Sequence, residues 1–275
     1  MECSITNLGA CIVETLFGFI IDLINMSLHP FLNIISKLMT EPVIISLFSD
    51  VWGSIVYVLS LFYGLLLIYI GFKFIISGDS PEEREKAKVS LKNTIIMMIL
   101  IQSSYYLYSL IISISSALTN SILNMAGNDF FYYSSENFSN IGIQVILLGL
   151  YLFHLVITVL FLVLRYDCVS IGVIFFAIAI FFYFIPFLHN FGKLILNFLG
   201  ILIFLPFFYS LVFLGTSRLV ESSSLSSIKI LIVIGAFSII IFGTLALYCF
   251  IIVKASSLAM KIASPIIKVA KFAGV

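Results

Sequence analysis

The sequence is poor in charge. Only 10% of its 275 residues are Asp, Glu, Lys or Arg, and the formal net charge is +1. An average soluble domain is about 25% charged. So little charge excludes an ordinary soluble domain, and it excludes a disordered chain, which needs low hydrophobicity and high net charge. The near-neutral balance also excludes a general electrostatic attraction to nucleic acid.

Cysteine and histidine are scarce as well. The four cysteines form no CxxC pair, and none of the three histidines stands at a metal-ligand spacing from them. The sequence has no HExxH, no paired intramembrane aspartates, no rhomboid-like Gly-x-Ser-Gly and no P-loop. We therefore expect no metal, no cofactor and no enzymatic activity.

Apolar residues fill the chain instead. They make up 62% of it, and the mean hydropathy is +1.23. Apolar runs of roughly 18 residues or more predict membrane-spanning helices, and there are six: 51–76, 94–118, 141–164, 169–188, 194–215 and 228–253. The turns at 165–168 and 189–193 are too short for anything but antiparallel neighbours. We predict an all-α polytopic protein of the cytoplasmic membrane, crossing it about six times.

The chain divides into five segments by composition. The positive-inside rule places the first charged loop in the cytoplasm, and the side of the C-terminus stays open. The predicted segments are an amphipathic N-terminal segment (1–50), a helical hairpin with a charged cytoplasmic turn (51–118), an external loop (119–140), a four-helix membrane core (141–253) and a basic amphipathic tail (254–275).

Residues 10–36 predict one amphipathic helix, bent at Pro30. At about 100° per residue, one face of this helix gathers its polar and small residues: Glu14, Gly18, Asp22, Asn25, His29 and Ser36. Such a helix either lies in the plane of the lipid headgroups or turns its polar stripe towards a wet cavity.

The most polar stretch follows the first apolar run. Ser80, Pro81 and Glu83 form a capping box with proline at the first helical position, and Glu82 is spaced to pair with Lys86. We expect an ordered hairpin whose second helix runs unbroken from residue 81 into the second span. Its cations either dock a partner or only satisfy the positive-inside rule: Arg84, Lys86, Lys88 and Lys92.

Polar groups inside the predicted spans are few, and such groups are the default functional candidates in a membrane. His154 is either a proton relay or a hydrogen-bonding link between helices. Arg165 is either an anchor that reaches the membrane surface or a fixed polar point of the core. Asn197 is expected between helices, and Pro186 and Pro206 are expected to kink theirs.

The tail carries four lysines. Lys254, Lys261 and Lys268 repeat every seven residues, on one helical stripe, and Lys271 follows. A basic amphipathic tail is typical of contact with anionic lipid headgroups. The alternative is contact with a nucleic-acid or protein substrate.

Two stretches carry a family resemblance. The first is GFKFIISGDSPEEREKAKVSLKN (71–93), followed by QSSYYLYSLIISISSALTNSI. It resembles the helix–charged hairpin–helix of archaeal polytopic proteins related to type IV secretion. The second runs from Arg165 through Pro186 and Gly192-Lys193 to Pro206. It resembles the core of the TrbL-type inner-membrane component of conjugation machines, which archaeal DNA-import (Ced) systems also contain, and the resemblance covers roughly 51–253.

This resemblance implies a channel or platform subunit for DNA or protein passage. Its implied partners are a separate cytoplasmic ATPase, small two-helix membrane subunits, anionic lipid headgroups and DNA in transit, in an oligomeric assembly. The residues alone leave two alternatives open, a stand-alone small-solute transporter or channel and a membrane scaffold.

Overall fold

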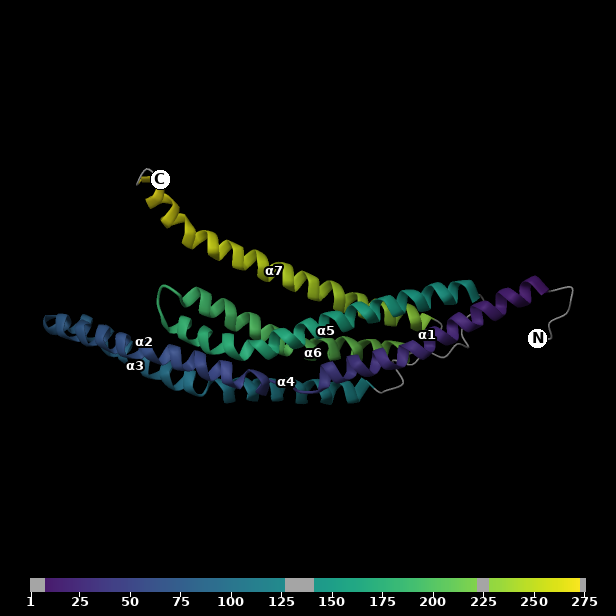
Figure 1. Ribbon diagram of the computed structural model, residues 1–275, viewed down its shortest axis with the longest axis horizontal. Coiled ribbons are helices and arrows are strands. Elements are labelled where there is room, and N and C mark those ends of the chain that lie inside the picture. Colours follow the sequence, from purple (N-terminus) through teal and green to yellow (C-terminus); the bar gives the residue numbers. More distant parts are fainter. Residues whose placement is uncertain (1–7, 127–140, 222–227, 273–275) are drawn as a thin grey trace. The chain divides into compact units, whose positions relative to one another are not determined.

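The computed structural model describes residues 8–126, 141–221 and 228–272, which are almost wholly helical and contain no strand. Seven α-helices lie in these ranges, and Figure 1 colours them in chain order. Their bounds are α1 Leu8–Thr40, α2 Ser49–Ile76, α3 Pro81–Gln102, α4 Ser104–Ala126, α5 Ile141–Phe184, α6 His189–Glu221 and α7 Lys229–Phe272. Two short 3₁₀ turns, Ser46–Phe48 and Ser77–Asp79, flank α2.

Five helices of the described ranges are long and apolar enough to cross a membrane: Ser46–Ile76, Ser104–Ala126, Val145–Phe184, His189–Val220 and Lys229–Ser257. The predicted all-α polytopic membrane protein is confirmed. The spans differ from the sequence prediction in number and in most of their boundaries. The second begins only at Ser104, because residues 94–102 belong to α3.

The expected break at 165–168 does not occur. Residues 141–164 and 169–188 were predicted as two antiparallel spans, but α5 runs through the polar positions between them without interruption. The prediction was wrong because Arg165, the residue that suggested a surface turn, is buried at 4% exposure and has a partner inside the protein. Residues 141–253 therefore hold three helices rather than four.

A second short turn is present, but not at 189–193 as predicted, because those residues are the first of α6. Residues 185–188 connect α5 to α6, and the Nδ1–H of His189 donates to the Tyr183 carbonyl at the end of α5 (2.7 Å). Gly192 lets the two backbones meet, because a Cβ there would lie 2.3 Å from the Tyr183 nitrogen.

The chain forms two compact units. Unit 1 comprises 1–41, 115–166 and 205–247, and unit 2 comprises 42–114, 167–204 and 248–275. In unit 1, Tyr151, Phe213 and Phe237 are almost fully buried, and the Phe237 ring contacts both of the others. The second half of α1 inserts an apolar stripe into this core: Leu28, Leu32, Ile35 and Met39.

The helix predicted for 10–36 is thus confirmed as α1, which continues through Pro30 to Thr40. The spacing of 4, 3 and 4 residues places its buried stripe on one face. Burying four such side chains stabilises the docked helix by several kcal/mol, at roughly 1.5–3 kcal/mol each before ordering costs. Whether its first half lies in the headgroup plane stays a prediction.

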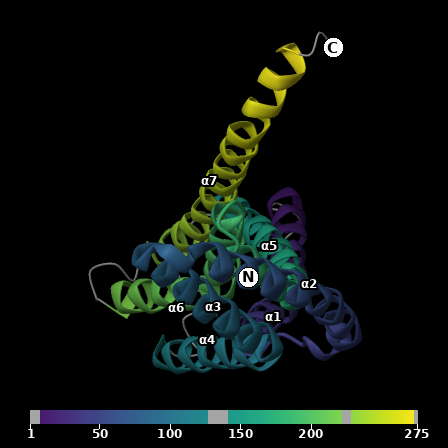
Figure 2. The same ribbon diagram turned by 90° about the vertical axis from the view of Figure 1, so that its left-hand side faces the viewer.

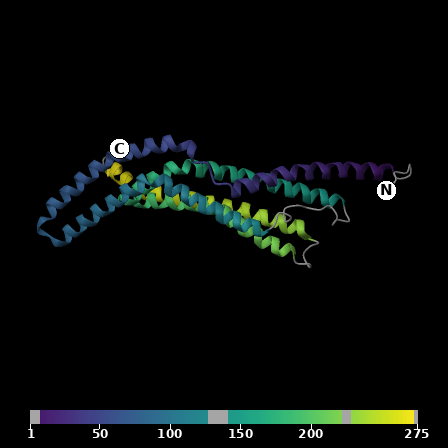
Figure 3. The ribbon, with the colours of Figure 1, turned by 90° about the horizontal axis from the view of Figure 1, so that it is seen from below.

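In unit 2, α2 and α3 form an antiparallel hairpin (Figure 3). Its core joins Val56 and Leu59 of α2 to Met97 and Ile101 of α3, and it adds three side chains of α5: Ala177, Ile180 and Phe181. The outward face of α2 stays apolar and exposed, as expected of a surface that meets lipid or other protein.

Candidate functional site

The turn of the α2–α3 hairpin is the most polar part of the described structure, and local bonds hold it in order. The Glu83 backbone N–H donates to the Ser80 side chain (3.4 Å), with Pro81 at the first helical position. The Ser80 N–H in turn donates to the Ser77 carbonyl (3.3 Å). The Ser80 half of the predicted capping box is therefore confirmed. The reciprocal bond is absent between these two described residues, because the Ser80 N–H bonds Ser77 and the Glu83 carboxylate bonds Lys86.

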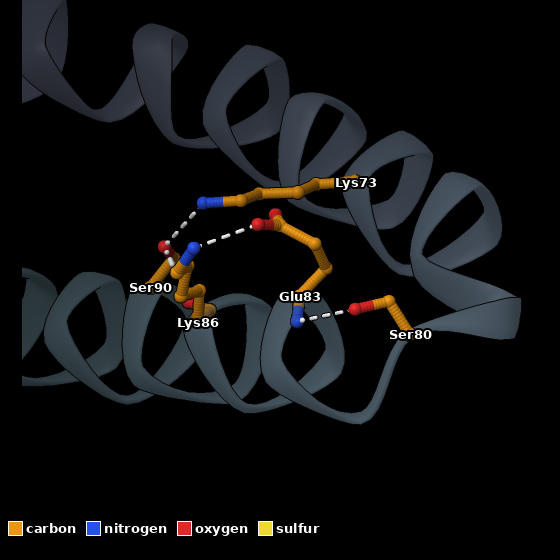
Figure 4. Close-up of polar contacts among 5 residues, drawn as sticks. All are labelled: Lys73, Ser80, Glu83, Lys86 and Ser90. Atoms are coloured by element: carbon orange, nitrogen blue, oxygen red, sulfur yellow. Dashed lines mark hydrogen bonds and ion pairs between the residues drawn. The ribbon is translucent and has the colours of Figure 1, made fainter.

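Inside the hairpin, α3 turns one charged face towards α2 (Figure 4). Lys86 pairs with Glu83 at 2.7 Å, and Lys73 of α2 donates to the Ser90 hydroxyl of α3 (3.4 Å). The hydrogen bond from Lys86, then its charge, lowers the pKa of Glu83 below the ordinary value, and Lys73 adds a smaller contribution. The predicted pair of Glu82 with Lys86 is wrong; the partner is Glu83, one position later.

The four cations predicted to dock a partner do not share one surface. At about 100° per residue, Arg84, Lys88 and Lys92 fall within about 80° of one another, whereas Lys86 lies on the opposite side. Buried Ala87 and Thr94 mark the face of α3 that is turned inward, and all three stripe residues are exposed. We call Arg84, Lys88 and Lys92 the basic stripe.

Weak local contacts hold the basic stripe outward. The Arg84 guanidinium donates to the Gly78 carbonyl (3.2 Å), and Lys88 lies 3.7 Å from Glu85. Exposed pairs of this kind contribute about 0–1 kcal/mol to the stability of the folded protein. They leave the charges available to a partner at little cost.

The helix that follows is not unbroken, contrary to the sequence prediction. It is interrupted at Ser103, where α3 and α4 meet at a bend (Figure 2). The Ser103 hydroxyl donates to the Ile99 carbonyl (2.8 Å), a bond that commonly bends helices. Next to it, the Trp52 indole N–H donates to the fully buried Ser104 hydroxyl (2.9 Å), which fixes the bend against the start of α2.

The core polar residues predicted from sequence occupy different settings. In unit 1, His154 donates from Nδ1 to the Leu150 carbonyl (2.8 Å), and its Nε2 lies 3.0 Å from the Ser238 hydroxyl of α7. That contact links two helices. Arg165 donates to the Leu38 carbonyl in the last turn of α1 (3.4 Å), where a cation also complements the helix dipole.

The two prolines and Asn197 are placed as follows. Pro186 lies in the α5–α6 turn rather than inside a helix, and it is exposed. Pro206 is buried within α6. Asn197 is exposed, and with Lys193 and Lys254 it lines a groove of about 760 Å³ between α6 and α7.

The predicted basic tail continues α7. Lys254 is exposed, and its ammonium lies 5.2 Å from the centre of the Phe250 ring. Lys261, Lys268 and Lys271 fall on the same helix, but their side chains lie outside the described residues. The external loop predicted for 119–140 lies outside them from residue 127 onward.

Sequence reasoning missed the partners of these groups. Nothing near Ser238 or Leu38 in the sequence points to His154 or Arg165, because each pair is joined only by tertiary packing. The groove had a detectable signal in the spacing of Asn190, Lys193 and Asn197 along one helical face. Among the described residues, no group of three or more His, Cys, Asp or Glu side chains could hold a metal ion.

Comparison with known proteins adds one family. Residues 44–111 match the model of the type IV secretion system pilin family. This stretch covers the whole α2–α3 hairpin and the start of α4. It includes residues 71–93 of the first stretch that carried the resemblance and about half of the span that follows them. No curated protein and no solved structure matches the chain. The match supports a membrane component related to type IV secretion, while the TrbL-type and archaeal resemblance stays a prediction.

Proposed function

We propose that this chain is a channel or platform subunit of a type IV secretion-like or DNA-import machine in the cytoplasmic membrane. One observation carries the proposal. The stretch similar to a secretion pilin, residues 44–111, is joined to three further helices that are long and apolar enough to cross a membrane. A pilin-like hairpin tied to that much additional apolar helix suits a component that stays in the membrane.

The hairpin supplies the surface for assembly. Its cap and the Lys86–Glu83 pair hold the turn rigid, so a partner meets a preformed surface and little ordering entropy is lost on binding. The basic stripe of Arg84, Lys88 and Lys92 complements an acidic surface. Charge complementarity of this kind gives specificity and a fast encounter.

The energy source lies outside the chain in this proposal. The sequence has no P-loop, and translocation through a membrane machine requires work. A cytoplasmic ATPase is therefore the proposed partner of the basic stripe. Small two-helix membrane subunits are the proposed neighbours of the exposed apolar face of α2, and DNA is one proposed cargo.

Purification from the native host in gentle detergent, followed by cross-linking and mass spectrometry, tests the proposal. We expect an ATPase and small membrane subunits to copurify, with cross-links through Lys88 and Lys92. Recovery of the chain alone, as a defined homo-oligomer, would contradict it and favour a stand-alone transporter or channel.

A matched pair of charge reversals tests the docking surface. Lys88→Glu places a negative charge on the basic stripe, and Lys37→Glu makes the same change at an exposed lysine of α1. We expect Lys88→Glu to reduce ATPase recovery several-fold, because each like-charge contact opposes association, and Lys37→Glu to leave it unchanged. Equal ATPase recovery with both variants would show that the basic stripe does not dock the ATPase. It would not bear on whether the chain belongs to a secretion machine, which the copurification experiment tests separately.

A further inference from the structure

The groove between α6 and α7 lies within unit 2 and outside the pilin-like stretch. Its volume is about 760 Å³, large enough for part of a lipid molecule. One wall is the first three turns of α6, and the other is a single face of α7, with residues 250, 251, 254 and 257. The two helices run in opposite directions (Figure 1).

The two ends of the groove differ in chemistry. Asn190 and Lys193 on α6 and Lys254 and Ser257 on α7 supply polar groups at one end, whereas Ile201 and Phe250 supply apolar groups further along. This polarity follows from the antiparallel helices, since the start of α6 lies beside the later part of α7. The groove is therefore amphipathic along its length.

The polar end coincides with the ends of two membrane spans. One candidate span begins at His189 and another ends at Ser257. Lys193 and Lys254 consequently lie within about one turn of a span end, at the depth of the lipid headgroups, while Ile201 and Phe250 reach into the depth of the acyl chains.

The charge at this end has one sign. No carboxylate is among the described residues that line the groove. The Lys254 ammonium lies 5.2 Å from the centre of the Phe250 ring, which itself lines the groove, so this charge borders the groove. Two lysines without a neighbouring acid leave a positive potential that an anion would neutralise.

We infer that this groove is a binding site for an anionic phospholipid, with its phosphate between Lys193 and Lys254 and an acyl chain along Ile201 and Phe250. Asn190 and Ser257 are the further donors to the headgroup. A neutral phospholipid has the acyl chain but lacks the net negative charge, so the site discriminates by headgroup.

The probe is phosphatidylglycerol. The full chain is reconstituted in mixed phosphatidylglycerol–phosphatidylcholine vesicles, released into detergent, and analysed by native mass spectrometry for retained lipid. We expect phosphatidylglycerol to be retained in preference to phosphatidylcholine. Lys193→Gln and Lys254→Gln should each weaken its retention about fivefold, the factor expected for loss of one lysine–headgroup attraction, and Lys37→Gln should leave it unchanged.

Filling the groove is an independent test that changes no charge. Gly200 lines the groove, and a Cβ there meets no atom within 4 Å. Gly200→Leu should therefore project into the acyl-chain region and displace the lipid without harming the helix, because leucine favours helix over glycine. Gly215→Leu is the matched control on the same helix, where a Cβ also has open space and no lipid loss is expected.

Three results would overturn the inference. The first is equal retention of both lipids by the unmodified chain. The second is unchanged phosphatidylglycerol retention in Lys193→Gln, Lys254→Gln and Gly200→Leu, which would leave the groove to a protein helix. The third is displacement of the lipid by inorganic phosphate alone, which would show a simple anion site.

Discussion

The guanidinium of Arg165, in the middle of α5, lies 3.4 Å from the carbonyl oxygen of Leu38, 127 residues earlier in the chain. The Ser116 hydroxyl of α4 bonds the Thr40 carbonyl two residues further on. The last turn of α1 is thus bonded by side chains of two other helices. Carbonyls at a helix end have no partner within the helix, and these side chains satisfy two of them in a partly buried setting.

Arg165→Met should loosen the end of α1. The variant keeps the length of the side chain but removes the donor to Leu38, and we expect a loss of about 1–3 kcal/mol, the range for a buried group left without its partner. Thermal unfolding in detergent, followed by circular dichroism, measures the change. Arg218→Met, at an exposed arginine of α6, should reduce the free energy of unfolding by less. An equal reduction in the two variants would show that the contact between Arg165 and Leu38 adds no stability of its own.

The single tryptophan reports on the bend between α3 and α4. Ser104→Ala removes the acceptor of the Trp52 N–H, so we expect a shift of its fluorescence emission and a destabilisation of about 1 kcal/mol. Ser113→Ala is the control on α4, because that exposed hydroxyl bonds a carbonyl of its own helix away from the bend. Identical emission spectra from both variants would contradict the contact.

Gly172 should accept a larger residue only at a cost in stability. A Cβ there would lie 2.3 Å from the Tyr108 hydroxyl and 2.7 Å from a methyl of Leu199. We expect Gly172→Ala to cost about 1–3 kcal/mol in thermal unfolding through overpacking. Gly149→Ala, in open space on the same helix, should be neutral or stabilising.

The Tyr108 hydroxyl also donates to the Val169 carbonyl (2.8 Å), which fixes it in the path of that Cβ. Tyr108→Phe removes the oxygen, so the double variant should cost less than the sum of the two single changes. Additive costs would mean that the clash lies elsewhere.

Glu83 should make hairpin stability depend on acid. Its pKa is lowered from the ordinary value of 4.5, so its contribution is present at neutral pH and is lost as the pH falls below that value through the folded-state pKa. Thermal unfolding measured at a series of pH values below 4.5 should show a small drop in the melting temperature, and Glu83→Gln should abolish that drop. Lys86→Met should abolish the same drop, because it removes the partner; a full drop in either variant would exclude the pair as its source.

The features that could be predicted from the sequence are those set by residues close together in the chain. Apolar runs located the spans, and Ser80-Pro81 located the start of α3, because caps and hydropathy act between near neighbours. The continuity of α5 escaped prediction because the partner of Arg165 comes from a helix far away in the sequence. A charge in an apolar stretch indicates a turn only if no internal acceptor is present, and Leu38 is that acceptor.

The direction of side chains around a helix was the second feature that the sequence predicted only in part. Arg84, Lys86, Lys88 and Lys92 look alike in the sequence, and their helical angles already separate Lys86 from the rest. Only the packing of Ala87 and Thr94 shows which side faces α2. The spacing of Asn190, Lys193 and Asn197 marks one polar face of α6, but the groove also needs α7 beside that face, and no local pattern predicts this.

The length of α5 has a consequence for the life of the protein in the cell. Its apolar stretch of 40 residues measures about 60 Å, whereas a hydrocarbon core of about 30 Å covers roughly 26 residues even at a steep tilt of about 40°. The excess needs a protein cover. In the assembly proposed above, neighbouring subunits would supply this cover. A copy made without them would expose that surface to membrane quality-control proteases, so the proposal predicts that the abundance of this chain follows the supply of its neighbours.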